Sequence, residues 1–310
     1  MAEKVKIHVL GTSSAVPTER RSHIGMLVSY KENNFLFDCG EGTQRQMRLA
    51  KLSPCKIDKI FISHWHGDHI LGLPGILQTM ALNGYNETLE IYGPKGTKEK
   101  MADLLNLHMK RYFNWSKHIG CNFDIKVFEQ SSGNIIENNE FLVDCLETEH
   151  GCNCLAYSFT VKEKSRLNKE KLEKLKLPNG PLVGKLAKGE TIEYKGKKID
   201  GSKLVYVEEK KKFCYISDTG YFDGLINFAK DSKVLISEST YSVEESELAE
   251  KHYHLTSGIA AEIAKKSNSK SLFLTHFSQR YSEIPHILEK EAKKVFLNTK
   301  ALEDFDVIEF

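Results

Sequence analysis

The segment His64-Trp65-His66-Gly67-Asp68-His69 places three imidazoles and one carboxylate within six residues. Imidazole and carboxylate are ligand types that suit zinc. Side chains two residues apart in an extended segment point the same way, so His64 and His66 can share one metal ion. Asp68 and His69, which follow the glycine, can reach a second ion. The alternative is a polar loop whose histidines cap neighbouring structure. Only 12 of the 310 residues are histidine, so we interpret the cluster as a metal site.

Side chains of the same kinds follow several short apolar runs, which we predict to be strands. Within a buried strand such a group would carry a large desolvation cost, whereas at the strand end it lies on a rim where it can hold an ion. Strands that share a direction gather their ends at one sheet edge, where α/β proteins bind ligands. Six side chains occupy this position: Asp38, His64, His150, Asp218, Glu238 and His276. The sequence therefore predicts one site at a common sheet edge.

The surrounding elements are predicted from apolar alternation, turn residues and capping residues. The predicted strands are 4–11, 23–30, 34–39, 59–63, 89–92, 123–128, 140–146, 154–161, 212–217, 233–237 and 271–275. The predicted helices are one that opens at Thr43 and those at 70–82, 98–109 and 258–265, the last with Thr256 or Ser257 as its N-cap.

Composition restricts the class of protein. The net charge of +2 excludes a protein-wide basic field, so nucleic-acid contacts must come from local clusters. The seven cysteines are odd in number and scattered, and no signal peptide is evident, so we expect reduced thiols and a cytoplasmic location. No apolar run approaches the ~20 residues of a membrane helix, so no membrane partner is expected.

One local cluster is basic. Residues 162–177 hold seven basic and three acidic side chains, with only a narrow stripe of leucines. A turn rich in proline and glycine follows, and then the stretch LVGKLAKGE. Such a segment has little to bury and indicates an arm that projects from the body, at residues 162–186. A solvated surface helix is the alternative that composition leaves open.

These motifs together resemble those of a known family. HWHGDH with downstream His150, Asp218 and His276 resembles the metallo-β-lactamase superfamily, whose α/β fold is a four-layer αββα sandwich. The stretches GTSSAVPTERR, FDCGEGTQRQ, HWHGDHILGLPG, GPLVGKL, SDTGYF, SESTY, HLTSGIAA and LTHFSQRY narrow the resemblance to ribonuclease Z, over most of the chain. The resemblance implies one domain over 1–310 with an inserted basic arm.

The family resemblance assigns the metal ligands. His64, His66 and His150 would hold one zinc ion, and Asp68, His69 and His276 a second. The carboxylate of Asp218 would bridge the two ions. This implies two zinc ions per subunit, with manganese or iron as possible substitutes in a histidine and carboxylate site. The expected reaction is endonucleolytic removal of the 3′ trailer from precursor tRNA, which leaves a 3′-hydroxyl on the tRNA and a 5′-phosphate on the trailer.

Three residues are expected to act in catalysis. Asp68 would accept the proton of the attacking water. The resemblance implies that His254 is the general acid for the leaving 3′-oxygen and that Glu238 orients it; His252 is a second candidate for the acid. Two positions depart from the family pattern. Ser237 stands where many relatives have histidine, and Ser22 stands where an asparagine commonly follows the arginine.

The arm is expected to bind phosphates of tRNA without reading bases, and in the family it serves the active site of the other subunit of a homodimer. No DNA partner is expected. The predicted tRNA-binding residues are Lys162, Lys164, Arg166, Lys169, Lys171, Lys174, Lys176, Gly180 and Pro181.

The sequence allows three alternative interpretations. Cys152 and Cys154 beside His150 could form a thiolate site, but a lone CxC motif is weak and free cysteine is usually buried. A glyoxalase-II-like thioesterase or a small-molecule phosphodiesterase could use the same scaffold, but would lack the basic arm. A non-catalytic tRNA-binding protein would have lost one or more ligands, whereas all seven are present.

Overall fold

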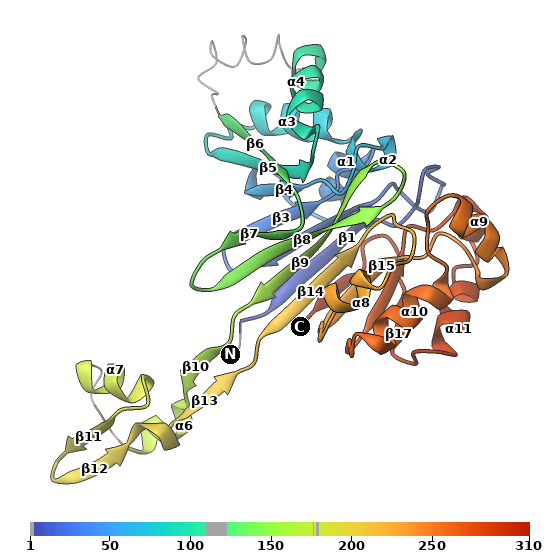
Figure 1. Ribbon diagram of the computed structural model, residues 1–310. Helices are drawn as coiled ribbons and strands as arrows, with labels where there is room; N and C mark the ends of the chain where they lie inside the picture. The colour runs from blue at the N-terminus through green and yellow to red at the C-terminus, as the bar shows by residue number, and fades with distance from the viewer. Residues whose placement is uncertain (1–2, 109–122, 176, 178–179) are drawn as a thin grey trace.

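The computed structural model describes residues 3–108, 123–175, 177 and 180–310 (Figure 1). Two seven-stranded sheets form the body. The first sheet has the order β18 (Val307–Glu309), β1 (Val5–Gly11), β2 (Gly25–Tyr30), β3 (Asn33–Phe37), β4 (Lys59–Phe61), β5 (Thr88–Pro94) and β6 (Asp124–Gln130). The second has the order β17 (Thr299–Ala301), β16 (Leu272–Thr275), β15 (Val234–Glu238), β14 (Lys211–Ile216), β9 (Asn153–Val161), β8 (Phe141–Glu149) and β7 (Gly133–Glu137).

The two sheets pack face to face through an aromatic core. On β3, Phe35 and Phe37 point inward while Leu36 points to the opposite face, as the two-residue period of a strand requires. Phe37 meets Phe213 and Tyr215 of the second sheet, with ring centroids 5.7 and 6.3 Å apart. Both sheets therefore bury one face in a shared core.

Helices cover the outer faces. The first sheet packs against α1 (Thr43–Leu49), α3 (Leu73–Leu82) and α4 (Thr97–His108). The second sheet packs against α8 (Gly224–Phe228), α10 (Ser257–Lys266) and α11 (His286–Lys293). The short helix α9 (Ser246–Lys251) precedes α10. The layers are helix, sheet, sheet and helix, so the predicted αββα sandwich is confirmed.

Strand direction positions the site. Strands β3 to β6 are parallel, and so are β14 to β17. Strand β8 runs the same way as β14, because both are antiparallel to β9. The carboxyl ends of these strands carry Asp38, His64, His150, Asp218, Glu238 and His276.

The prediction of one helix over 70–82 is wrong. The structure has α2 (Gly67–Ile70) and then α3, with a break at Gly72. The amide of Gly72 donates to the carbonyl oxygen of Cys39, and a Cβ there would lie 2.1 Å from the carbonyl oxygen of Gly40. Pro74 lies in the first turn of α3, where its missing N–H costs nothing. In α10, by contrast, the Thr256 side chain caps the helix as expected.

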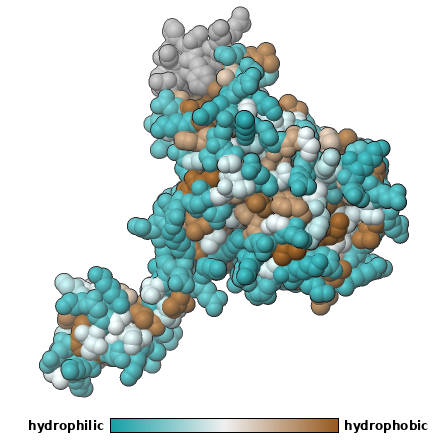
Figure 2. Space-filling view, in the orientation of Figure 1, coloured by the Kyte–Doolittle hydropathy of each residue, from teal (hydrophilic) through white to brown (hydrophobic). Residues whose placement is uncertain are grey.

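A thin projection leaves the body beside β9 and β14 (Figures 1 and 2). Strands β10 (Lys164–Leu167) and β13 (Val205–Glu208) form its antiparallel stem. Beyond them lie α6 (Lys169–Lys174), α7 (Pro181–Ala187), and the hairpin of β11 (Thr191–Tyr194) and β12 (Lys197–Asp200). We call residues 164–208 the arm. It continues past the expected boundary at 186 because the chain must return along β13 to rejoin β14.

Within the described residues, the structure has no helix that is both long and apolar enough to cross a membrane.

Candidate metal centre and active site

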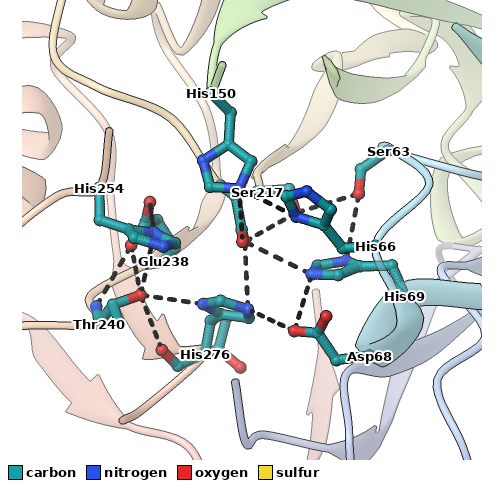
Figure 3. Close-up of polar contacts among 12 residues, drawn as sticks. Ser63, His66, Asp68, His69, His150, Ser217, Glu238, Thr240, His254 and His276 are labelled. Atoms are coloured by element: carbon teal, nitrogen blue, oxygen red, sulfur yellow. Dashed lines mark hydrogen bonds and ion pairs between the residues drawn. The ribbon is translucent and has the colours of Figure 1, made fainter. Parts of the chain in front are cut away.

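The first histidine cluster joins the HWHGDH segment to the end of β8. His64, His66 and His150 each direct one ring nitrogen to a common point. His64 Nε2 lies 2.9 Å from His66 Nδ1, and His150 Nε2 lies 3.3 Å from the same atom (Figure 3 labels His66 and His150). Burial, together with the neighbouring imidazoles, lowers the pKa of His64 and of His66. Neutral imidazole is the form that binds a metal ion.

The second cluster lies beside the first. Asp68, His69, Asp218 and His276 offer ligand atoms within 4.8 Å of one another. His276 Nε2 lies 3.2 Å from Asp218 Oδ1 and 3.3 Å from Asp68 Oδ2. His69 Nε2 is buried and has no hydrogen-bond partner, although it is 3.4 Å from Asp68 Oδ2. An unpartnered buried nitrogen aimed at two carboxylates fits a metal ligand.

Asp218 lies between the two clusters. Its Oδ2 is 3.5 Å from His150 Nε2, while its Oδ1 is 3.6 Å from His69 Nε2. Burial opposes ionisation of this carboxyl group, but His276 and His69 hold its pKa well below the usual range. Burial also opposes ionisation of Asp68, and His69 and His276 likewise keep its pKa low. Two anionic carboxylates among five imidazoles form a donor set that suits two divalent cations.

Buried partners fix the orientation of His69. Asp38 Oδ2 lies 2.9 Å from His69 Nδ1 and accepts the hydroxyl of Tyr215 at 2.7 Å. Asp38 also accepts the backbone amide of Ser63 at 2.7 Å and its hydroxyl at 2.9 Å. A carboxylate on Nδ1 leaves Nε2 as the free acceptor, which is the usual arrangement behind a metal-binding histidine. Asp38 holds a left-handed backbone (φ 54°) to reach this position.

The other cluster histidines have comparable supports. Thr240 Oγ1 lies 2.9 Å from His276 Nδ1, and the carbonyl oxygen of Tyr253 lies 3.0 Å from His150 Nδ1. Ser63, Thr240 and Tyr215 were not predicted from the sequence as supports. The sequence signal for Thr240 is its place in the SESTY motif, two residues after Glu238.

Glu238 and His254 form a buried pair against the clusters (Figure 3). His254 Nδ1 lies 2.9 Å from Glu238 Oε1, and the hydroxyl of Thr240 donates to Glu238 Oε2 at 2.7 Å. Burial lowers the pKa of His254, but the carboxylates of Glu238, Asp218 and Asp68 together outweigh burial and raise this pKa to about 9. The His254 ring lies 4.8 Å from that of His150 and 5.7 Å from that of His276, between centroids. A protonated imidazole therefore faces the region between the clusters.

Two cavities open at this rim. One, of about 380 Å³, is lined by both clusters and by His254, His252, Ser14 and Gln279. The other, of about 770 Å³, shares His66 and His150 with the first and is otherwise lined by a separate set that includes Trp65, Lys95, Lys100 and Tyr253.

The comparisons with known proteins agree with this geometry. The chain is 37% identical to "Ribonuclease Z" of Enterococcus faecalis, over 98% of this chain and 97% of that one. It is 38% identical to "Ribonuclease Z" of Methanothermobacter thermautotrophicus, over 98% and 96%. The chain belongs to the ribonuclease Z family. It is a hydrolytic nuclease.

Solved structures and a family model give further similarities. The structure of human tRNase Z, short form, covers 98% of each chain with a TM-score of 0.68 and 25% identity. A metallo-β-lactamase fold protein of Bacillus subtilis, YhfI, covers both chains fully with a TM-score of 0.71 and 21% identity. A family model described as "Anti-Pycsar protein Apyc1" matches residues 5–172.

The two departures from the ribonuclease Z pattern lie near the site without entering the clusters. The hydroxyl of Ser237 donates to the carbonyl oxygen of Glu238 at 3.0 Å, within the buried end of β15. The amide of Ser22 donates to Asp304 at 2.7 Å. His252 is exposed and lines the smaller cavity.

The cysteine alternative does not match the geometry. Cys154 is buried, and its thiol donates to the carbonyl oxygen of Asp218 at 3.3 Å. Burial raises the pKa of this thiol well above its usual value, which disfavours the thiolate that a metal requires. Cys152 is exposed, and neither cysteine joins a metal-capable cluster among the described residues.

The basic residues expected to bind tRNA fall into two groups. Three of them, Lys162, Lys164 and Arg166, pair with Glu137, Glu140 and Glu208 at 2.5, 3.0 and 3.1 Å. These three lie at the base of the arm. The amine of Lys171 reaches the carbonyl oxygen of Lys203, Lys169 and Lys174 are exposed on α6, and Gly180 and Pro181 begin α7. Lys176 lies outside the described residues.

The part of the arm beyond residue 186 was not predicted from the sequence. Five further lysines are exposed there: Lys188, Lys195, Lys197, Lys198 and Lys203. The sequence feature that could have predicted them is the excess of lysine, which continues beyond residue 186 and is interrupted by Gly189 and Gly196.

Proposed function

We propose that this ribonuclease Z family member removes the 3′ trailer from precursor tRNA. The observation that carries the proposal is the position of Asp218, whose two oxygens face different histidine clusters. The names of the relatives and of the human neighbour support the substrate. The products would be tRNA with a 3′-hydroxyl and a trailer with a 5′-phosphate.

Two divalent ions fit the clusters, and we propose that they are zinc. His64, His66 and His150 would hold one ion, Asp68, His69 and His276 the other, and Asp218 would touch both. Such ions supply Lewis-acid chemistry, since they lower the pKa of water and neutralise charge on an attacked phosphate.

The protein's own side chains would move the protons. Asp68 is ionised and lines the smaller cavity, so its carboxylate can accept the proton of the attacking water. His254 is protonated at neutral pH because Glu238 stabilises its charge. It would donate that proton to the departing ribose 3′-oxygen. The Thr240 hydroxyl holds Glu238 in place and also contacts His276, so the acid is positioned relative to the ligands.

The arm would hold the tRNA. Residues 164–208 contain twelve basic and six acidic side chains, a net charge of +6, whereas the whole chain carries +2. Positive charge on a projecting segment suits phosphate contacts without base readout. We further propose that the arm is an insertion in a single domain and that it serves the partner subunit of a homodimer in the cytoplasm.

Cleavage mapping tests this proposal. The purified protein is incubated with a precursor tRNA that carries a 3′ trailer, and both fragment ends are identified. One cut at the base of the trailer, with a 3′-hydroxyl on the tRNA, is expected. A 2′,3′-cyclic end, or cuts spread through the tRNA body, would contradict the proposal.

A further inference from the structure

The larger cavity adjoins the active site without containing the acid pair. Its lining includes Trp65, Lys95, Lys100 and Tyr253, together with His66 and His150 of the first cluster. Its volume of about 770 Å³ is within the range of pockets that hold small organic ligands. An RNA strand that is cut at the clusters continues on both sides of the broken bond. A cavity beside the clusters is therefore available to one of these two parts of the RNA.

Two aromatic side chains line this cavity. The indole N–H of Trp65 donates to Thr97 Oγ1 at 2.9 Å, which holds the ring in place. Tyr253 is 50% exposed, and its ring lies beside Gly151 and Gly220. Trp65 is partly buried against the core on the helix side of the first sheet, so Tyr253 offers the more exposed ring. Aromatic rings at a protein surface are the sites on which unpaired bases stack.

The charge of the cavity is positive. Lys95 and Lys100 are exposed, and neither forms an ion pair with a carboxylate of the described residues. The Lys100 amine lies 5.7 Å from the centroid of the Trp65 ring. Glu149 is the one acidic residue among the described residues that line the cavity. Amines beside an aromatic ring would provide both phosphate and base contacts.

We propose that this cavity binds the first nucleotide of the trailer, on the 3′ side of the bond that is cut. The inference rests on the proposed function. The nucleotide that carries the leaving 3′-oxygen must lie beside His254, which faces the smaller cavity. The trailer is joined to the same phosphorus through its 5′-oxygen. This oxygen does not lie on the line between the attacking water and the leaving 3′-oxygen, so the trailer leaves the reacting phosphate in a different direction. The larger cavity, which shares His66 and His150 with the smaller one, receives it.

The contacts then have separate roles. Trp65 and Tyr253 pack against the first trailer base. Lys95 and Lys100 contact the phosphate that joins the first and second trailer nucleotides. This arrangement accepts any base, since each base has a face that can stack.

The test uses precursor tRNAs with a two-nucleotide trailer. The linkage between the trailer nucleotides is either a normal phosphodiester or a neutral methylphosphonate. The variant K95A/K100A is compared with K265A/K290A, which removes two exposed lysines from α10 and α11. We expect kcat/KM of K95A/K100A to fall about tenfold for the phosphodiester and to stay at the wild-type value for the methylphosphonate.

A second pair of reagents tests the base contact. Tyr253→Leu keeps the backbone carbonyl that faces His150 but removes the ring. We expect kcat/KM of this variant to be about tenfold below the wild-type value on a normal trailer. When the first trailer nucleotide is abasic, we expect the variant and the wild type to have equal kcat/KM.

The outcomes separate this inference from the proposed function. Equal losses on the charged and neutral linkages, or equal losses in K265A/K290A, would overturn the trailer site while precursor cleavage stands. Sensitivity to an abasic nucleotide before the cut, instead of after it, would also overturn it. If the wild-type protein cuts no precursor tRNA, the proposed function fails and the trailer site fails with it.

Discussion

The rim, which is the sheet edge that carries the two histidine clusters, and the arm are built in opposite ways. At the rim, Asp38, Asp218 and Glu238 are fully or almost fully buried, and each accepts hydrogen bonds from neighbouring strands or loops. The arm has a small apolar core of its own, in which Leu186, Ile192 and Leu204 are buried. The arm carries a net charge of +6 and the whole chain a net charge of +2, so the rest of the chain carries −4.

This difference shows how chemistry and substrate binding can be divided. In a buried network each polar group depends on particular hydrogen-bond partners, so the loss of one side chain leaves its partners unsatisfied. On an exposed arm many lysines each contribute a little to the affinity for tRNA. The loss of one lysine therefore lowers the affinity only slightly, and the size of this effect depends on salt. Substitutions at the rim should therefore remove activity on every substrate, whereas substitutions in the arm should affect only large anionic ones.

The largest effect is expected from the clusters. His64→Ala should lower kcat/KM by about 10³-fold or more on both precursor tRNA and a small phosphodiester, because the charge stabilisation supplied by an ion is worth several kcal/mol. Chelation of divalent ions should have the same effect on the wild-type protein. His286→Ala is the matched control, since His286 is an exposed histidine at the start of α11 and lines neither cavity. Undiminished hydrolysis by His64→Ala would contradict the assignment.

The next effect is expected from the acid pair. His254→Gln should lower kcat by about 10²- to 10⁴-fold for a substrate with a poor leaving group. The loss should be much smaller for a nitrophenyl phosphodiester, whose leaving group needs no proton. If both substrates lose equally, His254 is not the acid.

The pH profile tests the same pair. Activity of a general acid is lost as pH rises through its pKa, and the neighbouring carboxylates, Glu238 foremost, outweigh burial and raise the pKa of His254 to about 9. Removal of the glutamate charge in Glu238→Gln lowers that pKa, so the basic limb of kcat should move to lower pH. A limb that stays in place would show that another group controls it.

A graded effect is expected from the arm. Leu167 and Val205 face each other across the stem, so residues 168–204 can be replaced by Asn-Gly, a two-residue turn that suits a hairpin. We expect the KM for precursor tRNA to rise by at least about tenfold, with hydrolysis of a small phosphodiester unchanged. Loss of both activities would refute the division of labour.

The smallest effect is expected at the tip of the arm. Lys195, Lys197 and Lys198 lie at the turn between β11 and β12. Their replacement by alanine should reduce the slope of log affinity against log salt by up to about 2 to 3 for precursor tRNA, at ~0.7–0.9 per phosphate contact. Replacement of the paired residues Lys162 and Lys164 should change the slope less, because carboxylates of the body already neutralise them.

Much of the fold and the site could be predicted from the sequence. The rim residues follow short buried strands, and strands of one direction end together, so Asp38, Asp218 and His276 could be expected at one edge. The family motifs then indicated the sandwich. The helix break at Gly72 was missed because local periodicity does not reveal that the backbone of Gly40 approaches there.

Other features depend on contacts between distant segments. The hydroxyl of Tyr215 reaches Asp38 across 177 positions, and Thr240 reaches His276 across 36. No spacing rule connects these pairs. The end of the arm was placed too early because the excess of lysine continues through a second half whose turns resemble ordinary loops. The pairing of Lys162 with Glu137 depends on how the stem leaves the body.

Metal content measured together with cleavage is the most direct test of the central claim. Wild-type protein, purified without added chelator, should contain two divalent ions per chain and cut precursor tRNA at the base of its trailer. Asp218→Ala should contain fewer than two ions per chain and should not cut. Full cleavage by metal-free protein, or two retained ions in Asp218→Ala, would contradict the claim that one carboxylate joins two ion sites.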